Sequence, residues 1–178
     1  ADPPYPGCAH LYKHHKDFAG EVDHASLVET LRGYDGWILH THVPGLSTLL
    51  PLVGESARYC AWVKPFAAFK RNVSVAYAWE PVFVAATRKP IVAGRTVMRD
   101  WFSAPITMKR GLAGAKPESV CRWLFELVGA DPEDDLVDLF PGTGGVTRAW
   151  EAWCRDVVDE RRLLGCTWST KEGCSDAH

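Results

Sequence analysis

Residues 136–145 constrain the fold most, because they predict three elements in direct succession. The mostly apolar residues 136–140 predict a strand, the glycine-rich residues 141–145 predict a tight turn, and a helix is expected at about residues 146–153. A turn without Cβ atoms that leads into a helix N-terminus lets a ligand approach closely and directs backbone N–H groups at it. Taken alone, the pattern is also compatible with a tight loop that binds nothing.

Short apolar runs alternate with helical patterns along the rest of the chain. The expected helices are 23–31, 44–53 and 120–128, and the expected strands are 36–41, 59–63 and a strand pair or one bent strand at 73–84. This alternation predicts an α/β fold with helices on both faces of a mixed, mostly parallel sheet. With 178 residues, 47% of them hydrophobic, the chain is expected to form a single domain over residues 1–178.

The first residues, Asp2-Pro3-Pro4-Tyr5, predict a stiff turn, and a strand is expected to precede it. The two prolines fix φ and remove two backbone donors, so the chain must leave an extended segment at Asp2. The turn presents the Asp2 carboxylate, the Pro3 carbonyl and the Tyr5 ring, an arrangement that suits a planar base with an exocyclic amine. The alternative is a structural turn that ends a strand and carries no chemistry.

Three segments resemble those of S-adenosylmethionine-dependent amino methyltransferases. Asp2-Pro3-Pro4-Tyr5 resembles their catalytic motif in its adenine-N6 form, and Asp138-x-Phe140-x-Gly142-x-Gly144 resembles their methionine-binding motif. Lys116-Pro117 resembles the segment that precedes the methionine-binding motif when the catalytic motif comes first. The order resembles the permuted class, including phage and actinobacterial relatives of the large adenosine-methylating family. The resemblance implies a Rossmann-like methyltransferase fold, S-adenosylmethionine as cofactor, and methylation of the N6 amine of adenine in DNA.

The same resemblance implies a role for each matched residue. Asp2 and the Pro3 carbonyl hold the amine hydrogens, Pro4 keeps the turn rigid, and Tyr5 stacks on the base. The residues implied to line the cofactor are Asp2, Lys116, Ser119, Asp138, Phe140, Gly142, Thr143 and Gly144. An acid on a strand after the glycine motif is implied to bind the ribose hydroxyls, and Asp159 or Glu160 is expected to be that acid. No metal is expected, and the residues Cys8, His10, His14 and His15 fit no standard zinc-ligand spacing.

The net charge of −2 hides a strongly basic middle third. Residues 64–116 carry 10 basic and 2 acidic side chains (+8), residues 1–63 carry 4 and 7 (−3), and residues 117–178 carry 6 and 13 (−7). Such a block predicts a polyanion partner. The resemblance implies that this partner is DNA rather than RNA. The candidate nucleic-acid contacts are Lys64, Lys70, Arg71, Arg88, Lys89, Arg95, Arg99, Lys109 and Arg110. Within residues 87–115, Trp101 and Phe102 are expected either to contact nucleic acid or to tether a surface loop to the core.

Other features restrict the setting and leave alternatives open. Six scattered cysteines without a Cys-x-x-Cys pair favour reduced thiols in a cytoplasmic protein. No apolar run of 18 residues and no signal peptide occurs, so no membrane association is expected, and a homodimer is compatible with the sequence. The alternative functions are RNA adenine-N6 methylation, more distantly cytosine-N4 methylation, and a catalytically inactive nucleic-acid-binding partner with the same fold.

Overall fold

The computed structural model describes residues 1–14, 18, 20–66, 73–90, 97–107 and 116–163. Four strands lie in one sheet in the order β1-β3-β2-β4. Their bounds are β1 Gly36–His40, β2 Arg58–Val63, β3 Trp79–Ala86 and β4 Trp101–Ser103. β3 is antiparallel to both β1 and β2, whereas β2 and β4 are parallel.

The sheet is mixed, as expected, but the expectation of a mostly parallel sheet is wrong for the described strands. Two of the three pairings, β1 with β3 and β2 with β3, are antiparallel. A parallel pairing of neighbouring strands needs a crossover, usually a helix, between them. The described residues between β2 and β3 contain no helix, so these successive strands pair directly and antiparallel.

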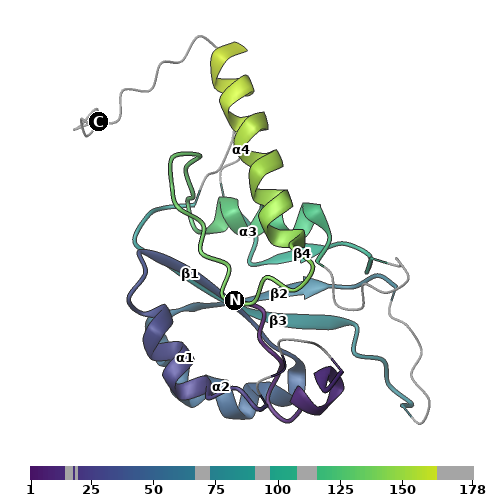
Figure 1. Cartoon of the computed structure of the whole chain (residues 1–178). Helices are drawn as coiled ribbons and strands as arrows, with labels where there is room; N and C mark the ends of the chain where they lie inside the picture. The colour runs from purple at the N-terminus through teal and green to yellow at the C-terminus, as the bar shows by residue number, and fades with distance from the viewer. Residues whose placement is uncertain (15–17, 19, 67–72, 91–96, 108–115, 164–178) are drawn as a thin grey trace.

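Helices cover both faces of this sheet, which confirms the expected α/β layering (Figure 1). The helices α1 His24–Leu31 and α2 Leu46–Val53 lie on one face, and α3 Glu118–Leu127 and α4 Gly145–Leu163 lie on the other. Three short 3₁₀ turns complete the described elements: η1 Ala9–Tyr12, η2 Val43–Gly45 and η3 Gly54–Ser56. The start of α1 is fixed by Asp23, whose carboxylate accepts from the N–H groups of Ala25 and Ser26.

Alternation along β3 builds the core on the two faces. Phe83 packs with the buried side chains of α1 and α2, whereas Val82 and Val84 pack with those of α3. Successive strand residues point to opposite faces, so one strand supplies both layers. None of the helices within the described ranges is long and apolar enough to cross a membrane.

The structure differs from the sequence-based expectations for helices and strands in four places. Residues 136–140 form no ladder, so the strand expected there is wrong; the cavity described below separates them from β1. Only Trp79–Ala86 of the expected 73–84 region is a strand. β4 lies inside the basic segment, where no strand was expected. α4 continues ten residues beyond the expected end at Trp153, because no proline or glycine interrupts residues 146–163.

Candidate functional site

The turn formed by residues 2–5 begins beside the end of β1. The Ala1 nitrogen donates to the Ile38 carbonyl at 2.7 Å, and the His40 N–H donates to the Ala1 carbonyl at 3.0 Å. One residue that bonds to positions two apart follows the pattern of parallel pairing. The following residue, Asp2, is therefore placed at the carboxyl end of β1, where ligands bind in open α/β sheets.

Asp2 is held from two sides. Its Oδ1 accepts from the Tyr5 hydroxyl at 3.2 Å, and its Oδ2 accepts from the Lys116 ammonium at 2.7 Å. Burial, and then the charges of Asp2 and Glu80, raise the pKa of Tyr5 well above its ordinary value, so the hydroxyl keeps its proton and donates. An ionised carboxylate has about four acceptor sites, so Asp2 can still accept from a substrate amine.

The Tyr5 ring stacks on the His42 imidazole, with centroids 5.3 Å apart and planes 16° from parallel. His42 therefore covers one face of the tyrosine ring. Tyr5 does not line the cavity described below, so its stacking on a base remains a prediction. Pro3 is buried, and no hydrogen bond to its carbonyl occurs within the described part of the chain. Pro3 does not line the cavity described below, so acceptance of the second amine hydrogen by its carbonyl remains a prediction.

Lys116 joins the turn to a second carboxylate. Its side chain is 4% exposed, and its ammonium lies 2.7 Å from Asp2 Oδ2 and 3.1 Å from Glu80 Oε1. Burial alone lowers the pKa of Lys116, but the charges of Asp2 and Glu80 outweigh burial and raise it above its ordinary value. The ammonium stays charged and is committed to these two acids, so the expected contact of Lys116 with the cofactor remains a prediction.

Glu80 and His40 belong to the site and were not among the expected site residues. Glu80 Oε1 accepts from His40 Nδ1 at 3.1 Å, and Glu80 Oε2 accepts from the Lys64 ammonium at 2.8 Å. The Trp62 ring lies 4.5 Å from the Lys64 ammonium and 5.8 Å from that of Lys116. The sequence signal for these two residues was one ionisable residue in each of two otherwise apolar strands, His40 in β1 and Glu80 in β3.

Burial, then the charge of Lys116, lower the pKa of His40, so the imidazole is neutral near pH 7 and Nδ1 carries the proton that Glu80 accepts. Burial alone would raise the pKa of Glu80, but the His40 hydrogen bond and the charges of Lys116 and Lys64 hold it well below its usual range. Ligand-type atoms of Asp2, His40 and Glu80 lie within 4.8 Å of one another. The Lys116 ammonium already supplies a cation to both carboxylates of this cluster, which does not favour a metal ion there.

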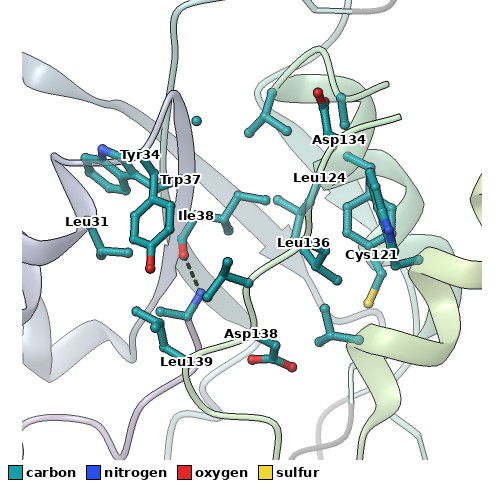
Figure 2. A pocket seen from close by; sticks show the side chains of 18 of the residues that line it. Leu31, Tyr34, Trp37, Ile38, Cys121, Leu124, Asp134, Leu136, Asp138 and Leu139 are labelled. Carbon is teal, nitrogen blue, oxygen red and sulfur yellow. Dashed lines mark hydrogen bonds between the residues drawn. The ribbon is translucent and has the colours of Figure 1, made fainter. Parts of the chain in front are cut away.

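A cavity of about 370 Å³ opens between the free edge of β1 and residues 134–139 (Figure 2). Ile38 and Trp37 lie on one side of it, and Leu136 and Leu124 on the other. The polar and charged lining residues include Asp2, Lys116, His40 and Asp138, and also Asp35, Arg88, Asp134 and Asp135. The cavity thus combines apolar walls with polar groups, which is typical of small-molecule sites.

Asp138 contributes an unsatisfied acceptor to this cavity. Its Oδ1 accepts from the Phe140 N–H at 3.2 Å, whereas its Oδ2 is buried and has no hydrogen-bond partner among the residues that the structure describes. Such an orphan acceptor is costly unless a ligand satisfies it. Gly142 and Gly144 follow with φ of 49° and 72°, and α4 begins at Gly145. The predicted glycine turn before a helix is therefore confirmed, and Asp138 fits a cofactor that carries a cationic or N–H donor.

Other residues expected at the cofactor do not line the cavity. Asp159 and Glu160 are exposed in the last turns of α4 rather than on a strand, and Asp159 lies 3.8 Å from Arg162. The strand expected there is wrong, and because neither residue lines the cavity, a ribose contact of Asp159 or Glu160 remains a prediction. The other expected cofactor residues that do not line it are Ser119, Phe140, Gly142, Thr143 and Gly144, so their contacts with a cofactor remain predictions.

The basic candidates divide into paired and exposed side chains. Arg88 binds Asp134 through two nitrogens, at 2.7 and 2.6 Å, and Lys64 is held by Glu80, so both charges are met internally. Lys89 and Arg99 are exposed, and the Arg99 guanidinium lies 5.2 Å from the Trp101 ring centroid. Phe102 instead stacks on Trp123 at 5.7 Å and tethers β4 to the core. The remaining candidates, Lys70, Arg71, Arg95, Lys109 and Arg110, lie outside the described residues.

Comparison with known proteins adds to this geometry. No protein-family model and no characterised protein sequence matches the chain. Among solved structures, the chain is similar to that of an M1.HpyAVI–SAM complex, with a TM-score of 0.57 and 15% sequence identity. The likeness covers 85% of this chain and 76% of that chain. It shows that the chain has a methyltransferase-like α/β fold.

Proposed function

We propose that this chain transfers a methyl group from S-adenosylmethionine to the exocyclic N6 amine of adenine in DNA. The observation that carries the proposal is the Asp2 carboxylate, fixed by Tyr5 and Lys116 in the lining of a cavity that also contains the orphan oxygen of Asp138. The solved structure similar in fold is named as a complex with SAM, which supports this choice of cofactor.

S-adenosylmethionine supplies an electrophilic methyl group when it is bound. Asp138 would accept a hydrogen bond from the ammonium of its methionyl end, and the backbone of the glycine turn would be accessible to its carboxylate. Asp2 and the Pro3 carbonyl hold the two hydrogens of the adenine amine, and the free face of Tyr5 stacks on the ring. Much of the rate then comes from holding the reactants in line, since this scheme needs neither a metal nor a covalent enzyme intermediate.

DNA is the proposed substrate because of the basic middle third. Lys89 and Arg99 are exposed cations for phosphates, and Trp101 offers a partly exposed ring beside Arg99. In a duplex the target base must be flipped out, which costs a few kcal/mol, and stacking on Tyr5 offsets about 1–3 kcal/mol of that cost. The protein is proposed to act in the cytoplasm.

The deciding experiment is incubation of the protein with tritiated S-adenosylmethionine and either DNA or RNA, followed by nucleoside analysis. The expected product is N6-methyladenine in DNA, and labelled RNA adenine would instead establish the RNA enzyme. Label in N4-methylcytosine would contradict the assignment of the base.

The matched variants are Asp2→Ala and Glu151→Gln. Asp2→Ala removes the proposed acceptor, whereas Glu151 is exposed on α4 and outside the site, so Glu151→Gln is expected to retain parent activity. If the parent binds DNA but neither binds the cofactor nor transfers label, the chain is the inactive nucleic-acid-binding partner.

A further inference from the structure

Glu80 is a buried carboxylate for which the methyl-transfer scheme has no direct use. It lies in β3 with its side chain 8% exposed, and its two oxygens contact His40, Lys64 and Lys116 at 2.8 to 3.1 Å. Burying such an ion pair costs free energy that well-packed apolar side chains would not cost. A carboxylate kept in this environment next to a reaction centre is therefore a candidate for function.

Lys116 connects Glu80 to Asp2. The same ammonium lies 2.7 Å from Asp2 Oδ2 and 3.1 Å from Glu80 Oε1, so two carboxylates share one cation. Without Glu80, the ammonium would pair with Asp2 alone and would draw that carboxylate away from other donors. A substrate amine would then compete with a full positive charge for Asp2.

We propose that Glu80 is a positioning residue for methyl transfer, which divides the charge of Lys116 and keeps Asp2 available to the amine. The inference rests on the proposed function and deepens it. Asp2 and Glu80 balance the charges of Lys64 and Lys116, and the adjoining His40 is neutral near pH 7. Removing the Glu80 charge leaves one positive charge in excess close to a nitrogen that becomes cationic during transfer.

The test is Glu80→Gln, which keeps the shape of the side chain and removes its charge. We expect kcat to fall about tenfold, less than the 10²–10³ typical of a direct contact, because Glu80 acts through Lys116. The Kd for S-adenosylmethionine and the KM for DNA should stay within about twofold, since a group that acts on the transition state alone changes kcat. The control is Glu29→Gln, an exposed carboxylate paired with Arg32, which should keep the parent kcat.

A second variant keeps the charge of the buried cluster constant. Glu80→Gln combined with Lys64→Met removes one negative and one positive charge, so it protects folding while it still leaves Lys116 to Asp2 alone. The kcat of this folded double variant should also fall. Thermal unfolding monitored by near-ultraviolet circular dichroism gives the folded fraction to which kcat is referred.

A folded Glu80→Gln or double variant with the parent kcat overturns the inference, as does a loss confined to Tm or to cofactor affinity. If the parent itself methylates no adenine, the proposed function fails, and this inference fails with it. The two failures are distinguished because failure of the proposed function is seen in the parent protein, whereas failure of this inference alone is seen only in the Glu80 variants.

Discussion

Asp2 and Asp138 are two carboxylates in the lining of the same cavity with opposite surroundings. Asp2 has one oxygen on Tyr5 and one on Lys116, whereas Asp138 has a buried oxygen without a hydrogen-bond partner in the described part of the chain. A carboxylate that is already oriented suits an acceptor whose position must be fixed during the reaction. A carboxylate with an unmet acceptor suits the tight binding of a cationic ligand. We therefore expect variants at these two positions to affect different kinetic constants.

Asp2→Asn should lower kcat by roughly 10²–10³, because it removes the negative charge that favours a cationic amine while one acceptor oxygen is kept. Asp2 is an acceptor in this scheme and not a base, since a carboxylate is far too weak to deprotonate a neutral aromatic amine beforehand. Single-turnover methylation of DNA measures the effect. Parent-like transfer by Asp2→Ala would place the catalytic centre elsewhere.

Asp138→Asn should instead weaken cofactor binding by about 1.5–3 kcal/mol, the usual contribution of a hydrogen bond to a charged group. Isothermal titration calorimetry with S-adenosylmethionine measures this change. The free protein should be no less stable than the parent, because Asp138 Oδ2 makes no hydrogen bond within the described structure. An unchanged affinity would show that the cofactor does not reach Asp138.

At the scale of elements, the glycine turn before α4 offers a test that distinguishes backbone strain from cofactor binding. Gly144 has a φ of 72° and Gly54 a φ of 59°, so alanine at either position is strained and should cost about 1–2 kcal/mol of stability. Only Gly144→Ala should also lower the affinity for S-adenosylmethionine in calorimetry, because Gly144 belongs to the turn that follows Asp138 and precedes α4, whereas Gly54 follows α2. Equal affinities would remove the glycine turn from the cofactor site.

The segment around β4 carries the exposed part of the proposed DNA contact. Arg99→Ala should reduce the slope of log K against log salt concentration by about 0.9, the contribution of one phosphate contact. Arg155→Ala is the matched control, since Arg155 is exposed on α4 in the acidic third of the chain. Fluorescence anisotropy with a labelled duplex measures both slopes. If the two variants lowered the slope equally, Arg99 would be no more a DNA contact than the control residue Arg155.

The sequence correctly predicted those helices and strands whose signal is local in the chain. Helices α1, α2 and α3 and strands β1 and β2 follow from periodicity, capping and apolar runs. The strand expected at residues 136–140 failed because an apolar run specifies burial, whereas a strand also needs a hydrogen-bonding neighbour. β4 could not be anticipated for the same reason, because its pairing with β2 is set by the tertiary structure.

At the scale of the molecule, only part of the site could be recognised in the sequence. The turn at Asp2 and the glycine motif were recognisable as patterns, although 136 positions separate Asp2 from Asp138. The network that joins Asp2 to Glu80 was not recognisable, because sheet register brings His40 next to Val82 and Trp62 next to Glu80. No local pattern encodes which ionisable residues of neighbouring strands will face a lysine from a third segment.

This buried network should also set the pH range over which the whole protein is stable. The pKa of His40 lies below its ordinary value of 6.5 in the folded protein, so on acidification below about pH 6.5 the unfolded chain takes up the proton first and stability falls. The pKa of Glu80 is likewise lowered from 4.5, so a second loss follows as the pH falls below about 4.5.

At alkaline pH the direction is reversed. Burial raises the pKa of the free thiols Cys60 and Cys121 from 9.0 to about 11, and the unfolded thiols ionise first, so stability is lost as the pH rises above about 9. Thermal unfolding across about pH 2–11 should therefore give a Tm plateau between about pH 7 and 9. Glu80→Gln should flatten the loss below about pH 4.5 and leave the alkaline side unchanged. A parent-like acid side in that variant would show that Glu80 is not ionised in the folded protein.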